Sequence, residues 1–263
     1  MVVLVATLDN KNVPELIKNM NLSDVETIVV NQSSSGSRKS YVENLGNSTI
    51  IHSDRLGLSA SRNDAIAQAS ELDICQIADD DMVFVHQYES IVKEAYQEFP
   101  DADIIIFIVD FENNVVRKKA HPKGRIYHLA AMQTSSVQIS FKKSSFVKAG
   151  LYFDERFGIG AEFGSGEENI FLFDALKKGL KIYSYPVRIA ELRIRESQWD
   201  RSNTPENCRK RGAIYKRMSP KWYWLLIIQF AIRKRQMMRP EISILANLKY
   251  MFQGAREFQK SRT

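Results

Sequence analysis

The chain has 263 residues, of which 44% are apolar, 26% charged and 10% aromatic, and this composition excludes disordered, collagen-like and small disulfide-rich proteins. The formal net charge of +6 is unevenly distributed along the chain. Residues 1–200 contain 22 Lys and Arg against 28 Asp and Glu, whereas residues 201–263 contain 15 against 3, so we expect any anionic partner to meet the last quarter of the chain.

The first 111 residues alternate short apolar runs with helical patterns. We expect strands at residues 2–8, 27–30, 48–52, 74–78 and 103–111, because these runs are short, apolar and rich in β-branched residues. Helices are expected between them, a short one around residues 14–20 and longer ones at residues 59–70 and about 87–99. This alternation implies βαβ units, so the predicted fold class is α/β, with a doubly wound, mostly parallel central sheet that binds ligands at its carboxyl edge.

The second half of the chain has a different residue pattern. A strand is expected at residues 137–141, and a shaped loop follows, because six of the twelve glycines fall between Gly150 and Gly179. The segment at 164–169 should open a helix that stops at Gly179, and residues 180–185 should form a strand that ends at Pro186. Beyond about residue 200 the pattern is helical, basic and aromatic, which predicts a C-terminal extension over residues 201–263.

Three consecutive aspartates, Asp79, Asp80 and Asp81, directly follow the expected strand at 74–78. Like charges at this spacing repel one another unless a cation or solvent intervenes. Mg²⁺ and Mn²⁺ prefer hard carboxylate oxygens and bridge protein carboxylates to substrate phosphates. A solvated acidic loop is the alternative, but a position at the carboxyl end of a central strand favours a divalent metal site.

Short motifs occur in the order found in family 2 glycosyltransferases with the GT-A fold. Residues 57–66 read GLSASRNDAI and residues 74–81 read ICQIADDD, which resemble the family's G-x-S-x-A-R-N run and its Asp-x-Asp strand end. Residues 166–169 read GEEN and residues 178–182 read KGLKI, similar to the family's later helix start and lysine-glycine turn. The resemblance covers about residues 1–190 and implies a GT-A-like nucleotide-sugar-binding and catalytic domain over residues 1–200.

The resemblance also implies which residues hold the donor. Asp79 and Asp81 would bind Mn²⁺ or Mg²⁺ and, through the metal, the diphosphate of a nucleotide sugar, with Asp80 between them. Thr7 and Asn31 match positions that contact the nucleotide in the family. The sequence departs from the family at residues 31–33, where relatives commonly carry an aspartate that reads the base, so the nucleotide itself is not predicted.

Four further residues match motif positions near the reacting groups. Arg62 and Asn63, in the first turn of a helix, are expected to meet phosphate, although a local helix cap with a salt bridge from Arg62 to Asp64 is the alternative. The resemblance places the base that accepts the proton of the acceptor hydroxyl at Glu168, or else at Glu167. Two acidic residues at a helix N-terminus are also stabilising without any catalytic role.

Family members often carry a histidine as a further metal ligand after the next strand. This chain has Glu191 in that region, so Glu191 is a candidate substitute or the ligand is missing. The histidines lack a metal-binding spacing among themselves and are interpreted as ordinary surface or turn residues; they are His52, His86, His121 and His128.

These features predict an inverting, metal-dependent glycosyltransferase that moves a sugar from a nucleotide-diphosphate sugar to a saccharide acceptor, with a lipid-linked acceptor in surface polysaccharide or glycan synthesis favoured. A nucleotidyltransferase of similar sheet architecture is the first alternative, although residues 9–12 lack the expected glycine-rich loop. A non-catalytic nucleic-acid or membrane-binding module is the second, but the acidic first 200 residues argue against a nucleic-acid partner. A catalytically inactive relative also stays open.

The apolar run at residues 222–232 is too short to cross a bilayer as a helix, since 11 residues extend roughly 16 Å. Tryptophans and flanking basic residues suit the headgroup zone of an anionic membrane, although a helix packed on the catalytic domain is the alternative. Two cysteines, Cys75 and Cys208, cannot form a disulfide framework and no apolar signal core follows the N-terminus. We therefore expect a cytoplasmic protein, peripheral on the inner face of the cytoplasmic membrane.

Overall fold

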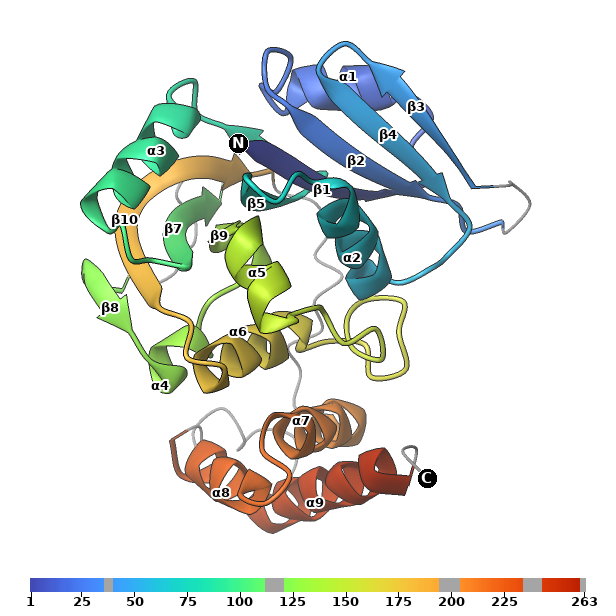
Figure 1. The fold of residues 1–263 in the computed structure, drawn as a ribbon. Helices are drawn as coiled ribbons and strands as arrows, with labels where there is room; N and C mark the ends of the chain where they lie inside the picture. The colour runs from blue at the N-terminus through green and yellow to red at the C-terminus, as the bar shows by residue number, and fades with distance from the viewer. Residues whose placement is uncertain (36–39, 112–120, 194–203, 234–242, 261–263) are drawn as a thin grey trace.

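The computed structural model describes residues 1–35, 40–111, 121–193, 204–233 and 243–260. Within these residues ten strands form one sheet in the order β3-β4-β2-β1-β5-β9-β7-β10-β6, and β8 pairs with β10 off this path (Figure 1). The strands are β1 (Val2–Leu8), β2 (Thr27–Gln32), β3 (Tyr41–Leu45), β4 (Ser48–Ser53), β5 (Ile74–Asp79), β6 (Met82–Phe84), β7 (Ile104–Phe111), β8 (Gly124–Ile126), β9 (Ile139–Lys142) and β10 (Ile182–Leu192).

Helices cover both faces of this sheet (Figure 1). Side chains alternate between the faces along each strand, so Val3 and Val5 of β1 pack with α1 and α3, while Val2 and Leu4 pack with α2, α5 and α6. Burial on both faces explains why the central strands read as continuous apolar runs. The helices are α1 (Val13–Asn19), α2 (Leu58–Gln68), α3 (Tyr88–Glu98), α4 (His128–Ala131), the 3-10 helix η2 (Ser136–Gln138), α5 (Lys143–Ala149) and α6 (Glu167–Lys177).

The strands from the first part of the chain pair mostly in parallel. β1 pairs in parallel with β2 and β5, and β2 with β4, which brings the carboxyl ends of these strands to one edge. β9 runs antiparallel between β5 and β7, and β6 runs antiparallel to β10. The sheet is therefore mixed around a parallel centre, in agreement with the predicted fold class.

β10 differs from the prediction that a strand ends at Pro186. The strand continues to Leu192, and its register against β7 shifts between Ser184 and Arg188 and again before Ala190. A bulge of this kind accommodates proline, which has no N–H to donate to a neighbouring strand. The extension matters for the site because β10 then pairs with β6, the short strand that follows the three aspartates.

Three helices form the C-terminal part, α7 (Pro205–Met218), α8 (Tyr223–Arg233) and α9 (Ile244–Lys260). The expected boundary at residue 200 lies outside the described residues. The helices α7 and α9 cross with their backbones in contact, because a Cβ atom on Gly212 would lie 1.8 Å from the Met251 carbonyl oxygen and one on Gly254 2.0 Å from that of Arg209. None of the described helices is long and apolar enough to cross a bilayer.

The core of these three helices also includes residues of the first part of the chain. Phe157 and Phe163, from the loop before α6, and Ile170, in α6, pack in the same apolar cluster as Met218 and Phe258. Both cysteines are buried thiols, one in β5 and one in α7. The helical extension therefore packs tightly on the segment that leads into α6.

Candidate active site

The three aspartates lie at the carboxyl edge of the sheet, where β5 ends. Asp79 is the last residue of β5, and Asp80 and Asp81 form the turn into β6. The Thr7 hydroxyl, near the end of β1, donates to Asp80 Oδ2 at 2.7 Å, and the backbone N–H of Arg193 donates to the Asp81 carbonyl at 2.8 Å. All three aspartates are partly exposed, so their carboxylates line an accessible turn that is fixed from both sides.

Arg62, in the first turns of α2, is a buried cation, with 3% of the residue exposed. Its Nη2 donates to Asp79 Oδ1 at 3.1 Å and to the Ser136 hydroxyl at 2.8 Å, and its Nη1 donates to Glu167 Oε1 at 2.9 Å. Burial alone would lower the pKa of Arg62, but the charges of Asp79, Glu167 and Glu168 outweigh it and the pKa is raised. Arg62 is thus a permanent buried cation. It joins the segment Asp79, Asp80 and Asp81, which we call the aspartate turn, to α6.

The alternative contact of Arg62 with Asp64 is absent from the described residues. Arg55 takes that place, with its Nη1 2.6 Å from Asp64 Oδ1 and its Nη2 2.8 Å from Glu155 Oε2. No side chain caps α2, which begins after Gly57. The local-cap interpretation of Arg62 is therefore wrong, because the guanidinium reaches across the fold to residues on β5, η2 and α6.

Glu167 and Glu168 are the first two residues of α6, and both are buried, at 1% and 7% exposure. The helix N-terminus favours their negative charges, and Arg62 pairs with the first of them. Glu168 Oε1 accepts a hydrogen bond from the Asn169 amide at 2.7 Å. The two neighbours therefore have different surroundings, since Glu167 is committed to Arg62 and Glu168 is the more exposed of the pair.

The turn before α6 depends on a glycine and on the C-terminal helices. Gly166 has a φ of +89°, in the region that favours glycine, and a Cβ atom there would lie 2.3 Å from Ile214 Cδ1 of α7. The side chain of Ile214 thus occupies the space beside the residue that immediately precedes the two glutamates. Sequence patterns gave no sign of this contact, because the two residues belong to segments with different composition.

Two asparagines expected to meet the nucleotide are engaged with the protein itself. The Asn31 amide accepts from the backbone N–H of Asn10 at 3.1 Å and donates to the carbonyl of Asn10 at 2.8 Å. The Asn63 amide accepts from the backbone N–H of Phe153 at 2.9 Å and donates to its carbonyl, also at 2.9 Å. Asn31 therefore holds the turn after β1, and Asn63 holds the loop that leads to Gly158.

Glu191 lies on β10 and its carboxylate pairs with Arg188 on the same strand. In the described part of the chain, no three His, Cys, Asp or Glu side chains gather as a metal site, so the structure does not bring Glu191 together with Asp79 and Asp81 as a three-ligand set. Two carboxylates on an exposed turn still suit a hard divalent cation that takes its other ligands from water and from substrate phosphate.

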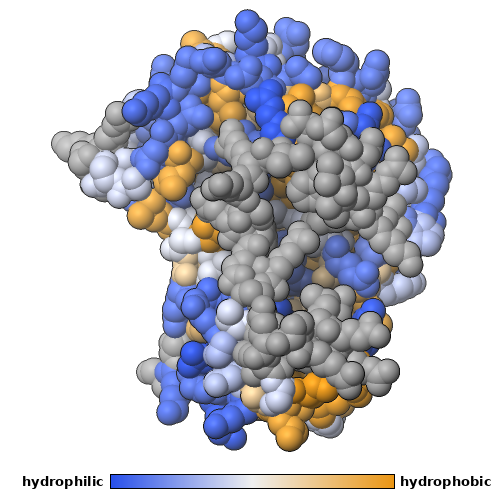
Figure 2. All heavy atoms as spheres, turned by 180° about the vertical axis from the view of Figure 1, so that it is seen from behind, coloured by the Kyte–Doolittle hydropathy of each residue, from blue (hydrophilic) through white to orange (hydrophobic). Residues whose placement is uncertain are grey.

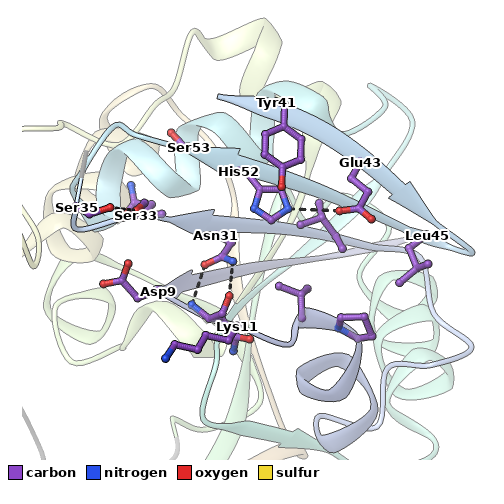
Figure 3. Close-up of a pocket in the computed structure, with 15 residues that line it drawn as sticks. Asp9, Lys11, Asn31, Ser33, Ser35, Tyr41, Glu43, Leu45, His52 and Ser53 are labelled. Carbon is purple, nitrogen blue, oxygen red and sulfur yellow. Dashed lines mark hydrogen bonds and ion pairs between the residues drawn. The ribbon is translucent and has the colours of Figure 1, made fainter. Parts of the chain in front are cut away.

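A groove of about 580 Å³ opens beside the ends of β1 and β2 (Figure 3). Asp9 and Lys11 lie on one side of it, and Figure 3 shows Asn31 between them and the opposite wall. That wall is formed by Tyr41 stacked on His52, with ring centroids 4.3 Å apart and planes inclined by 12°. The stacking follows from the pairing of these two residues in the β3 and β4 register.

Sequence reasoning missed this wall. It did not predict β3, whose five residues are all exposed, and it interpreted His52 as an ordinary surface or turn residue. His52 instead has only 13% of its side chain exposed, and its Nε2 lies 3.5 Å from Glu43 Oε2. Apolar and polar residues are mixed on both faces of β3, since Glu43 lies between Tyr41 and Leu45 on one face. The strand therefore lacks the alternating pattern that would predict it.

Comparison with known proteins gives a match to the sequence model described as Glycosyl transferase family 2, over residues 2–151. The chain belongs to glycosyl transferase family 2. This assignment confirms the resemblance seen in the motifs and makes the protein a glycosyltransferase, so the nucleotidyltransferase and nucleic-acid-binding alternatives are set aside. No curated protein matches the chain.

Solved structures similar to this family 2 glycosyltransferase include S. aureus TarS 1–349 in complex with UDP-GlcNAc, with a TM-score of 0.63, 12% identity, and coverage of 99% of this chain and 91% of that one. The mannosyltransferase PcManGT from Pyrobaculum calidifontis, in complex with GDP-Man and Mn²⁺, has a TM-score of 0.50 and 12% identity, with coverage of 99% of this chain and 74% of that one. At these identities the likeness shows the fold alone, which is the predicted GT-A fold.

Proposed function

We propose that this glycosyltransferase is an inverting, metal-dependent enzyme that transfers a sugar from a nucleotide-diphosphate sugar to a saccharide acceptor. The observation that carries the proposal is the buried Arg62, which contacts Asp79 of the aspartate turn and Glu167 of α6. In an inverting transfer the acceptor hydroxyl attacks the anomeric carbon on the side opposite to the departing diphosphate, and one rigid connection between the two groups of carboxylates supports that geometry.

Asp79 and Asp81 are the proposed ligands of Mn²⁺ or Mg²⁺, with Asp80 fixed beside them by Thr7. Hard carboxylate oxygens on a partly exposed turn fit such an ion. When bound, the metal would neutralise the charge that grows on the departing diphosphate. Glu191 is the weaker candidate ligand, because its carboxylate is already paired with Arg188.

The groove between the turn at Asp9 and the Tyr41–His52 stack is the proposed place of the nucleoside. Its volume of about 580 Å³ lies in the range of small-molecule sites, and an aromatic wall suits the face of a base. Among the similar structures, TarS was solved with UDP and UDP-GlcNAc and PcManGT with GDP-Man. Both uridine and guanosine nucleotides are therefore the first ones to test.

Glu168 is the proposed general base. It would accept the proton of the acceptor hydroxyl while that oxygen bonds to the anomeric carbon, and the bond from this carbon to the diphosphate oxygen would break on the opposite side. Glu167, held by Arg62, would position the start of α6. In this assignment Arg62 and Asn63 support the site from within the protein and do not themselves hold phosphate.

The finer proposal concerns the acceptor. We infer that it is a lipid-linked saccharide in surface polysaccharide or glycan synthesis, and that the enzyme works peripherally at the inner face of the cytoplasmic membrane. The basic balance of residues 201–263, with 15 Lys and Arg against 3 Asp and Glu, supports an anionic membrane surface as partner.

Thermal unfolding with nucleoside diphosphates tests the donor site, because a ligand that binds only the folded state raises its apparent stability. We expect UDP or GDP to raise the unfolding temperature more with Mn²⁺ than without it. The variants Asp79→Asn and Asp81→Asn should lose the Mn²⁺-dependent part of this increase, each compared with itself in the absence of nucleotide.

The exposed Asp24, outside the aspartate turn, supplies the matched control, since Asp24→Asn removes the same charge and should keep the full metal-dependent increase. Unchanged metal-dependent stabilisation in both site variants would contradict the assignment of the turn. Hydrolysis or transfer of sugar from the stabilising nucleotide sugar then separates an active enzyme from an inactive relative.

A further inference from the structure

One side of α8 presents apolar side chains to solvent. Ile227 and Ala231 are buried against the neighbouring helices, whereas Trp224, Ile228 and Ile232 are 39%, 41% and 68% exposed. With Leu225, at 45%, these side chains fall within about 100° of one another around the helix axis. The helix is therefore apolar on both its packed side and its solvent side.

The apolar face continues at the start of the helix. Trp222, which is 59% exposed, lies just before α8, and its ring centroid is 6.3 Å from that of Trp224. Figure 2 shows an orange patch at the lower end of the molecule, the end that carries α8 in Figure 1. Contiguous exposed apolar surface of this kind marks an interaction site, and none of these residues belongs to the candidate active site.

Lysine and arginine side chains lie around this face. Residues 204–233 contain seven Lys and Arg against the single acidic Glu206. Lys221 and Arg233 are exposed at its two ends, and the ammonium of Lys216 lies 4.3 Å from the centroid of the Tyr223 ring. Tryptophan side chains beside lysine and arginine are the combination that suits the boundary between lipid headgroups and acyl chains.

We propose that this face of α8 docks in the headgroup zone of an anionic lipid bilayer, with Trp222, Trp224, Leu225, Ile228 and Ile232 entering the interface. The docking surface rests on the proposed function in one respect, since it would bring the enzyme to the layer that holds a lipid-linked acceptor. A second copy of the chain fits less well, because five partly exposed side chains fall short of the ~800 Å² per partner that a stable interface buries.

Co-sedimentation of the full chain with vesicles tests the proposal. We expect binding to vesicles of phosphatidylcholine and phosphatidylglycerol, weaker binding at high salt, and little binding to phosphatidylcholine alone. The double variant Trp224→Ser/Ile228→Ser should lower the affinity for anionic vesicles by about tenfold or more. Leu72→Ser is the matched control, because Leu72 is 94% exposed on the sheet domain and should not affect vesicle binding.

Two outcomes would overturn the docking surface: equal vesicle binding by the double variant and the parent chain, or a dimer in sedimentation velocity that the double variant abolishes. Nucleotide-dependent thermal stabilisation, measured on the same samples, confirms that the variant is folded and keeps the two proposals apart. A chain that binds vesicles but no nucleotide retains the docking surface and loses the proposed function. Nucleotide binding without vesicle binding gives the reverse result.

Discussion

Arg62 is the residue on which the proposed arrangement depends most. Its partners Asp79 and Glu167 are 17 and 105 positions away in the chain, and the guanidinium holds them through separate nitrogens. A buried ion pair seldom adds much net stability, but removing one partner is costly because the other charge stays buried. We therefore expect the main role of Arg62 to be fixing the relative positions of Asp79 and Glu167.

The two glutamates should differ when each is replaced by glutamine. Glu168→Gln should leave nucleotide binding and stability unchanged but lower kcat by roughly 10² to 10⁴, as expected for the loss of a general base. Glu167→Gln should lower the free energy of unfolding by about 3 kcal/mol, because Arg62 loses its fully buried partner. Urea unfolding and donor turnover measure both effects.

The exposed Glu94 of α3 provides the control for both variants, since Glu94→Gln makes the same change far from α6. An active Glu168→Gln enzyme together with a stable but inactive Glu167→Gln enzyme would move the base by one position. Loss of nucleotide binding in Glu168→Gln would place that residue on the donor side of the reaction.

At the scale of the elements, the turn before α6 joins two parts of the chain. Gly166→Ala should destabilise the protein by about 2 kcal/mol or more, because the new Cβ combines a positive φ with a clash against Ile214. Gly179→Ala is a matched control, since Gly179 has a similar φ of +84° and no atom within 4 Å of the new Cβ. The difference between the two variants in urea unfolding measures the contact with α7, and equal losses would argue against it.

A partly buried ion network also links the loop before α6 to α7. Asp154 Oδ2 lies 2.6 Å from Arg156 Nη2 and 2.7 Å from Arg217 Nε, and Arg217 continues to Asp174 at 2.9 Å. Burial would raise the pKa of Asp154, but the hydrogen bonds from Arg156 and Arg217 outweigh it and lower the pKa to about 2. Asp154 therefore stays ionised in the folded protein under all but strongly acidic conditions.

The depressed pKa of Asp154 predicts how stability changes with pH. The unfolded carboxyl titrates near pH 3.9, so the contribution of Asp154, about 2 kcal/mol, is fully present above that pH and is lost as the pH falls towards 2. Asp154→Asn should remove this part of the acid sensitivity in urea unfolding at pH 6, 4 and 3. A pH dependence identical to that of the parent chain would contradict the assignment.

The elements divide into those that the sequence predicts and those that it does not. β1, β2 and β5 are buried on both faces, so their apolar runs are unambiguous. β3 is exposed along its whole length and carries no such signal, so the stacking of Tyr41 on His52 could not be anticipated. The extension of β10 past Pro186 depends on a bulge, which is set by pairing with β7 and not by local propensity.

The same division holds for the candidate site. The aspartate turn and the glutamate pair were predictable because each is contiguous in sequence and follows or opens one element. The connection through Arg62 to Ser136 and Glu167 was not, since it joins residues 74 and 105 positions apart. Long-range contacts of this kind follow from the tertiary arrangement, which no motif encodes.

At the scale of the whole molecule, the crossing of α7 and α9 determines how firmly the C-terminal helices are held. Alanine normally stabilises a helix relative to glycine by up to about 1 kcal/mol. Gly212→Ala should have the opposite effect on the free energy of unfolding and lower it by roughly 3 kcal/mol, because the new Cβ would lie 1.8 Å from the Met251 carbonyl oxygen. Urea unfolding gives the sign directly, and a variant as stable as the parent chain would mean that the helices separate easily.

The two cysteines have a practical consequence for the molecule as a whole. Burial raises the pKa of the Cys75 thiol to about 12, and the Cys208 thiol is buried in α7 with its Sγ 2.7 Å from Asn247 Oδ1. Thiolates are the reactive species, so maleimide reagents should leave both residues unmodified while the protein is folded. A cysteine introduced at Ile232 would then take a fluorophore selectively in the otherwise native chain, and its quenching by labelled lipids would report how deeply α8 sits.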